Sequence, residues 1–260
     1  MSRIINGFTA AAFALAALTL ATPALSAAVN PLYSSVGGQV FGNGIYVNQY
    51  DTKQDSSEAR VEASGATYDV LARAQTDFGI NKAYAAAATT GVYVGSVYAT
   101  SSWMDFLTIT EGGKSGAGTV RYQFRVDGTA VSGPGGGDSA SANFQVYHDG
   151  SEVRLSNVSG SIFETSDLPF TYGEAFSLQT DLSVNVAYNG VADFFNTLEL
   201  VSITPAGAEG AQLSTEFGGE SFAPVFKGNA AAAVPEANTF ALALPALVMV
   251  GAVVIKRRKK

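Results

Sequence analysis

The residues able to do chemistry are few and scattered along the chain. There is one histidine, His148, and there is no cysteine. This composition excludes a histidine-rich metal centre, a thiolate nucleophile and any cysteine-ligated metal. A Ser-His-Asp arrangement would depend on His148, which directly precedes Asp149-Gly150, a pair typical of a tight turn. We therefore interpret His148 as a polar residue that caps a hairpin in water, and we predict no catalytic residue and no cofactor.

Acidic side chains are the other candidates for catalysis. A glycosidase uses two carboxylates about 5 to 10 Å apart across a cleft. The acidic residues of the body that could serve are Glu111, Glu152, Glu164, Asp167, Glu174, Asp181, Asp193 and Glu199. Because the sequence does not bring two of them together, we interpret them as polar faces of strands. The loops at Asp138 and at Asp149 with Glu152 leave calcium binding open, although EF-hand spacing is missing.

Two glycine-containing segments imitate nucleotide-binding loops. Gly113-Lys114-Ser115 resembles the end of a P-loop, but Thr108 stands where that motif needs a glycine. Residues 133–138 contain four glycines without a surrounding βαβ unit. We predict that both segments are loops. Trp103 could stack on a sugar ring together with tyrosines, but we favour a place for it in the core.

Period-two alternation through the middle of the chain predicts β-strands that would position these residues. The clearest strand covers residues 119–127 and is expected to end in a turn at Asp127-Gly128. A second strand covers 176–188, and Asn189-Gly190 predicts a two-residue hairpin with an antiparallel return through 191–203. His148-Asp149-Gly150 predicts another hairpin, between 139–147 and 152–155. Further candidate strands cover 44–49, 67–74, 92–98 and 105–110.

These strands predict an all-β fold, an antiparallel β-sandwich of jelly-roll type, with a barrel as the alternative. We expect an N-terminal signal helix and a C-terminal transmembrane helix to flank it. The predicted organisation is a secretory signal peptide over 1–27, the β-sandwich domain over 28–204, a C-terminal extension and linker over 205–233, and a sorting signal over 234–260.

The first residues have the layout of a secretory signal peptide. Arg3 supplies positive charge and residues 8–20 form an apolar run. Ala24, Ser26 and Ala27 are small residues suited to a signal peptidase, with cleavage after Ser26 or after Ala27. An uncleaved anchor helix is the alternative, but the apolar run is short for a membrane span.

The other end carries an apolar segment and a basic tail. Residues 240–255 contain no charge, and a helix there spans about 24 Å at ~1.5 Å per residue. Snorkelling lysines extend it toward the ~30 Å hydrocarbon core, so we predict a transmembrane helix over 240–255. The positive-inside rule keeps the tail cytoplasmic and the body outside, in agreement with the signal peptide. The basic tail consists of Lys256, Arg257, Arg258, Lys259 and Lys260.

The same end resembles a known sorting signal. Val234-Pro235-Glu236-Ala237, the apolar segment and the basic cluster stand in the order of a PEP-CTERM signal. The resemblance implies that an exosortase, a membrane-embedded protease, recognises the Pro-Glu region and releases the protein from its tail. Ala237 replaces the usual second proline and Pro245 interrupts the apolar run. The body loosely resembles domains found upstream of such tails, through residues 103–109 and 192–198, which favours a β-sandwich and implies no activity.

The part between the ends is acidic. All 22 acidic residues lie between Asp51 and Glu236, where nine basic residues leave a net charge of −13. Such a surface repels nucleic acid and favours solubility. We predict an exported, non-enzymatic protein that is membrane-anchored by its C-terminal helix and reaches the cell surface or extracellular matrix after processing. Its partners would be the membrane, signal peptidase and exosortase. The alternative is a carbohydrate-binding module or polysaccharide-acting enzyme on the same tail, with an extracellular polysaccharide as partner.

Overall fold

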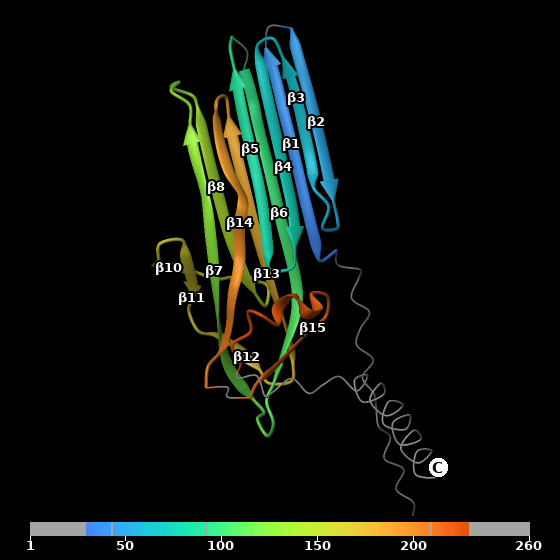
Figure 1. Ribbon diagram of the computed structural model, residues 1–260, viewed down its shortest axis with the longest axis vertical. Helices are drawn as coiled ribbons and strands as arrows, with labels where there is room; N and C mark the ends of the chain where they lie inside the picture. The colour runs from blue at the N-terminus through green and yellow to red at the C-terminus, as the bar shows by residue number, and fades with distance from the viewer. Residues whose placement is uncertain (1–29, 43, 92, 208–209, 229–260) are drawn as a thin grey trace, which may run out of the picture.

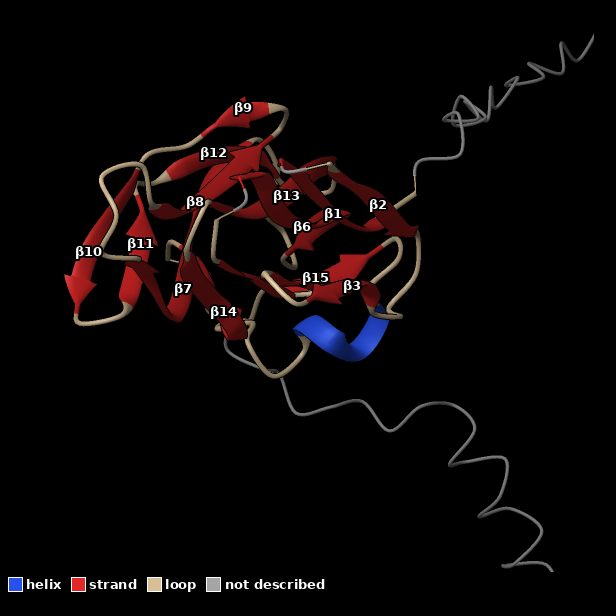
Figure 2. Cartoon of the chain, turned by 90° about the horizontal axis from the view of Figure 1, so that it is seen from above, coloured by secondary structure: helices blue, strands red, loops and turns tan. Residues whose placement is uncertain are grey.

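Two antiparallel sheets face each other in the computed structural model, which describes residues 30–42, 44–91, 93–207 and 210–228 (Figures 1 and 2). Sheet A has the strand order β2-β1-β6-β13-β8-β9, with β15 also paired to β6. Its strands are β1 (Leu32–Gly42), β2 (Ile45–Lys53), β6 (Tyr93–Thr110), β8 (Ser139–His148), β9 (Ser151–Glu152), β13 (Ala175–Ala187) and β15 (Gln212–Thr215).

Sheet B has the order β10-β11-β7-β14-β5-β4-β3, with β12 also paired to β7. Its strands are β3 (Ala59–Gly65), β4 (Tyr68–Asp77), β5 (Ile80–Thr89), β7 (Ala117–Ser132), β10 (Leu155–Ser159), β11 (Ile162–Thr165), β12 (Leu168–Thr171) and β14 (Gly190–Pro205). From β5 to β8 every connection carries the chain to the opposite sheet. The predicted all-β antiparallel sandwich is confirmed at this level.

The predicted signal helix and transmembrane helix lie outside the described residues. Among the residues that the structure describes, no helix has the length and apolar character needed to cross a membrane.

The core follows the alternation read from the sequence. On β7, Val120, Tyr122 and Phe124 are buried, while Arg121 between them is exposed. On β13, alternate residues starting at Phe176 point inward in the same way. Burying each such side chain contributes roughly 1.5 to 3 kcal/mol. The inward faces of the two sheets therefore supply the main stabilisation of the fold.

The turn predicted at Asp127-Gly128 is absent. The pair Asp127-Gly128 lies inside β7, which continues to Ser132. Opposite it, the register of β14 shifts between Asp193 and Thr197, and the ring of Phe194 lies so close to Gly128 that a Cβ there would approach its Cδ1 within 2.2 Å. Gly128 thus makes room for a bulge in the neighbouring strand, a role that glycine also takes inside strands.

Asn189-Gly190 turns the chain, but it does not form the predicted two-residue hairpin. The strand β13 before it pairs with β6 and β8 in sheet A, and β14 after it pairs with β5 and β7 in sheet B. The Asn189 side chain accepts a hydrogen bond from the Thr89 amide at 2.6 Å and donates one to Asp138 at 3.2 Å. These contacts with residues distant in the sequence hold Asn189 at the point where the chain passes from sheet A to sheet B. By contrast, the hairpin at Asp149-Gly150 is confirmed by the pairing of β8 with β9. Its second strand is shorter than the predicted 152–155, because β9 ends at Glu152 and Leu155 begins β10 in sheet B.

A buried polar network joins the two sheets. The Thr76 hydroxyl of β4 lies 2.7 Å from the Ser34 hydroxyl of β1 and 2.8 Å from the Ser101 hydroxyl of β6. Asn81 of β5 donates to the Ser101 carbonyl at 2.7 Å and accepts from the Thr180 hydroxyl of β13 at 2.6 Å. All five side chains are fully buried. Since buried polar groups are costly unless they are hydrogen-bonded, this network fixes how the sheets align.

The segment after residue 204 also belongs to the sandwich. After β15, the 3₁₀ helix η1 (Gly219–Phe222) places the Phe222 ring 5.6 Å from the ring of Trp103. The buried carboxylate of Asp105 on β6 accepts hydrogen bonds from the amides of Phe217 at 3.0 Å and Gly218 at 2.7 Å. The amide of Glu216 also donates to it, at 3.1 Å. The extension expected over 205–233 is thus held on the core as far as it is described.

Candidate functional site

The predicted processing residues lie outside the described part of the chain. These are the signal-peptidase residues Ala24, Ser26 and Ala27, the sorting residues Val234, Pro235, Glu236 and Ala237, and the basic cluster Lys256, Arg257, Arg258, Lys259 and Lys260. Within the described residues, the candidate site is therefore the surface of the β-sandwich.

Most of the carboxylates considered for catalysis contact a neighbouring donor. The pairs are Glu111 with Lys114, Glu152 with Gln145, Glu164 with Gln123, Asp167 with Arg121, Asp181 with Ser102 and Gln179, and Glu199 with Arg125. Asp193 lines an open hollow of about 240 Å³ together with Asp127, and it accepts a hydrogen bond from the Phe195 amide at 3.1 Å. No group of three or more His, Cys, Asp or Glu within the described ranges is arranged to hold a metal ion.

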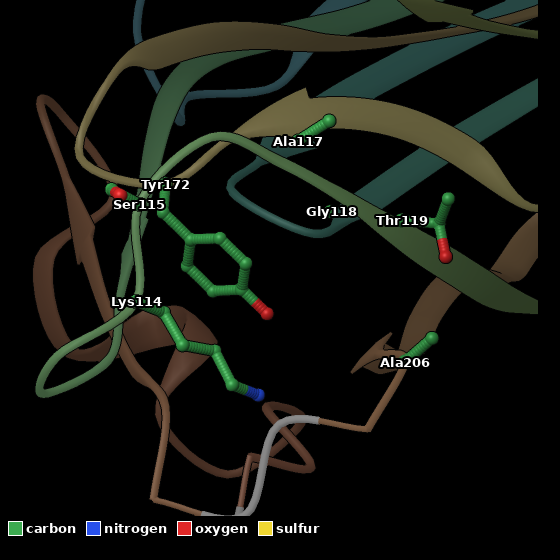
Figure 3. A pocket seen from close by; sticks show the side chains of 7 residues that line it. All are labelled: Lys114, Ser115, Ala117, Gly118, Thr119, Tyr172 and Ala206. Carbon is green, nitrogen blue, oxygen red and sulfur yellow. The ribbon is translucent and has the colours of Figure 1, made fainter.

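The segment that imitates a P-loop forms part of a loop beside a larger hollow of about 440 Å³ (Figure 3). Lys114 extends toward Tyr172 and donates a hydrogen bond to the Gly207 carbonyl at 2.8 Å. Its ammonium also lies 2.9 Å from Glu111, and this hydrogen bond raises the pKa of Lys114. Lys114 thus connects the β6–β7 loop to the segment that follows β14, which is a structural role for its ammonium group.

The interpretation of His148 as a solvent-facing cap is wrong. His148 is only 5% exposed, because it has the same inward parity on β8 as Phe144 and Val146. In the neutral imidazole, Nε2 donates to the Pro169 carbonyl at 2.8 Å and Nδ1 accepts from the Tyr122 hydroxyl at 3.0 Å. Burial raises the pKa of Tyr122 well above its ordinary value, so the phenol keeps the proton that it donates.

We expect His148→Phe to lower the free energy of unfolding by about 2 kcal/mol. Phenylalanine preserves the ring contact with Phe176 but leaves the Tyr122 hydroxyl and the Pro169 carbonyl without their partner. The matched control is Tyr147→Phe on the same strand, whose side chain lies on the outer face. Urea unfolding of both variants tests this role, and equal stabilities would contradict it.

Trp103 lies in the core, as expected from the sequence. It is 1% exposed and packs against Phe222, so it is not available to stack on a sugar. The most exposed aromatic rings lie elsewhere, on the outer surface of sheet A.

The open surface of β2, β1 and β6 carries a set of aromatic rings that we call the tyrosine face. Its rings are Tyr33 and Phe41 of β1, Tyr46 and Tyr50 of β2, and Tyr98 of β6. Tyr46 is 73% exposed, Tyr50 55%, Phe41 45% and Tyr33 38%. Sequence reasoning did not locate this face, although the outward parity of these residues on neighbouring strands was the available signal.

Glycines let the rings lie flat over the strands. Gly37 of β1 is paired with Tyr50 on one side and Tyr98 on the other. A Cβ at Gly37 would stand 2.5 Å from the Tyr98 ring and 2.8 Å from the Tyr50 ring, so the two rings cover the backbone that glycine leaves bare. Phe41 covers Gly95 of β6 in the same way. Tyr50, Tyr98 and Phe41 are thereby packed against the backbone of the strands.

Uncharged polar side chains fill the space between the rings. Gln39 donates a hydrogen bond to the Tyr50 hydroxyl at 2.8 Å, and Ser35 is hydrogen-bonded to Tyr98. Burial raises the pKa of Tyr98, which keeps this phenol neutral. Other outward residues of these strands include Asn48, Thr52, Ser96, Thr100, Ser102 and Met104. No described outward residue on β1, β2 or β6 of this face is charged.

The outer surface of sheet B has the opposite chemistry. Arg73 contacts Glu58 at 2.8 Å and its guanidinium lies 3.9 Å from the centre of the Phe195 ring. Arg125 contacts Glu199 at 3.1 Å across β7 and β14. The Arg73 hydrogen bond holds the pKa of Glu58 below its usual value. The outer surface of sheet B is therefore ionised, whereas the part of sheet A formed by β2, β1 and β6 is neutral and aromatic.

Comparison with models of protein families, with curated proteins and with solved structures gives no match.

Proposed function

We propose that this chain is an exported, non-enzymatic protein of the cell surface or extracellular matrix, with a C-terminal tail that an exosortase recognises and removes. The observation that carries the proposal is the agreement of the two ends on one topology. An apolar run after Arg3 directs export, and the apolar segment before Lys256 keeps the basic tail inside.

The architecture of the body supports an adhesive or structural role. Its interior is filled by side chains, and the acidic residues weighed for catalysis mostly contact neighbouring donors. We infer that the alternation of strands between the two sheets is a jelly-roll variant, in which both sheets present a broad outer surface. Such surfaces suit contacts with extended partners outside the cell.

We expect the tail to be lost only in a host that contains an exosortase. The experiment is to express residues 1–260 with and without the enzyme and to measure the intact mass of the product in membrane and extracellular fractions. The variant Pro235→Ala combined with Glu236→Ala should keep its tail in both hosts, whereas Ala230→Ser should be processed like the wild type. A wild-type product that still ends at Lys260 in the exosortase host would contradict the proposal.

Carbohydrate binding is a second candidate function. One observation favours it, namely the set of exposed aromatic rings on sheet A, of which Tyr46 and Tyr50 on the edge strand β2 are the most exposed. Aromatic faces bury apolar surface well, and hydroxyl and amide groups beside them supply hydrogen bonds.

A further inference from the structure

We propose that the tyrosine face binds a linear, uncharged polysaccharide. This inference deepens the second candidate function, carbohydrate binding. It rests on the export proposal in one respect, since an extracellular polysaccharide is accessible only to an exported protein. It rests on three properties of the face, which are its charge, its geometry and its rigidity.

The charge of the face selects a neutral ligand. The described body is rich in carboxylates, yet the outward positions of β1, β2 and β6 carry tyrosine, serine, threonine, asparagine and glutamine. An anionic polymer would find no cation there and would be repelled by Asp181 on the neighbouring strand β13, whose carboxylate accepts a hydrogen bond from Ser102, and by Glu152 farther along sheet A. A cationic partner would find no ion pair on the tyrosine face. A neutral sugar, whose ring has an apolar surface edged by hydroxyls, matches both kinds of side chain.

The spacing of the rings selects a polymer rather than a single sugar. Three rows across the strands carry rings, namely the row of Tyr33, the row of Gly37 with Tyr50 and Tyr98, and the row of Phe41 with Tyr46. Successive rows are four residues apart, which corresponds to roughly 13 Å at ~3.3 Å per residue. The rings thus extend over roughly 26 Å along the strands. A ligand that contacts all three rows must contain several sugar units.

The rigidity of the face lowers the cost of binding. The Tyr50 and Tyr98 ring centres lie 6.5 Å apart over Gly37, and Gln39 holds the Tyr50 hydroxyl. Rings that are already ordered lose little conformational freedom when a ligand covers them. Phe41 is similarly placed against Gly95.

The test uses the full-length chain purified in mild detergent and mixed with insoluble cellulose, starch granules and, as the charged comparison, polygalacturonate beads. We expect the protein to sediment with at least one neutral polymer and not with polygalacturonate. The variant Tyr46→Ala with Tyr50→Ala should weaken that binding about tenfold or more. The ring-retaining variant Tyr46→Phe with Tyr50→Phe should bind within about threefold of wild type, since stacking needs the ring.

A matched control lies on the other sheet. Val131 and Val191 are exposed on the outer face of sheet B, so Val131→Ala with Val191→Ala removes apolar surface without touching the tyrosine face. This control should bind like the wild type. Circular dichroism of each variant shows whether the sandwich is retained.

Three results would overturn the proposal. The first is that the folded wild-type protein binds no neutral polysaccharide on these solids or on a glycan array. The second is that it binds equally well after both tyrosines become alanine. The third is that the wild type forms a dimer that the alanine variant abolishes, which would make the face a contact between copies. Because binding is measured on the uncleaved chain, none of these results depends on whether an exosortase removes the tail.

Discussion

Replacing Asp105 with alanine is expected to lower the free energy of unfolding by about 3 to 5 kcal/mol. The carboxylate is completely buried and accepts hydrogen bonds from the amides of Phe106, Glu216, Phe217 and Gly218. Alanine would leave these donors without an acceptor inside the protein. The segment from 216 to 222 would also lose the contact that holds it on β6.

Two variants make the role of the Asp105 side chain testable. Asp105→Asn keeps one acceptor oxygen but turns an amide donor toward a backbone N–H, so we expect an intermediate loss of about 2 kcal/mol. Asp77→Ala is the matched control, because Asp77 also accepts from the next amide, that of Phe78 at 2.8 Å, but is exposed.

Urea unfolding gives the stabilities of these variants, and hydrogen exchange should show faster exchange at residues 216–222 in Asp105→Ala than in wild type. Unchanged exchange in this segment, or a loss no larger than that of Asp77→Ala, would contradict the role assigned to Asp105.

The strands were predictable because alternation is a local property. Residues 119–127 lie inside β7 and residues 176–187 lie inside β13 with the expected inward faces, since one apolar residue in every two is enough to define a strand on a core. Tyr188, which was expected to continue the inward face, lies beyond the end of β13 and is exposed. The partners of these strands depend on contacts that are distant in the sequence. Asn189, for example, is fixed by Thr89, one hundred positions earlier.

The alternation of inward and outward residues also indicates which polar residues are buried. Asp105 has the parity of Trp103 and Leu107, and His148 has the parity of Val146. A polar residue at an inward position must find a partner when it is buried, so parity alone predicts that such residues are bonded inside the protein. The identity of each partner depends on the other sheet and could not be read from the sequence.

The tyrosine face was missed for a related reason. Its rings come from three strands, and Gly37 between Tyr50 and Tyr98 reads in the sequence only as part of a Gly-Gly pair. Only the pairing of β1 with β2 and β6 shows that this glycine lies beneath two rings.

Asn81→Ala is expected to lower the free energy of unfolding by about 2 to 4 kcal/mol. The change leaves the Thr180 hydroxyl without its acceptor at 2.6 Å and the Ser101 carbonyl without its donor at 2.7 Å. Both groups are buried between the sheets, where water does not replace the lost partner. The exposed side of the same strands supplies a control in Ser183→Ala, whose hydroxyl lies 3.3 Å from Thr100, and we expect that variant to stay within about 1 kcal/mol of wild type.

A double variant distinguishes the loss of hydrogen bonds from the loss of side-chain volume as the cause of the lower stability. Asn81→Leu with Thr180→Val removes both members of the side-chain pair while keeping the space filled, so it should recover about 1 to 2 kcal/mol relative to the sum of the single variants. Recovery would follow because an unsatisfied buried hydroxyl costs more than an apolar group of the same shape. Strict additivity in urea unfolding would show that Asn81 and Thr180 are not coupled. The alignment of β5 with β13 would then depend on apolar packing alone.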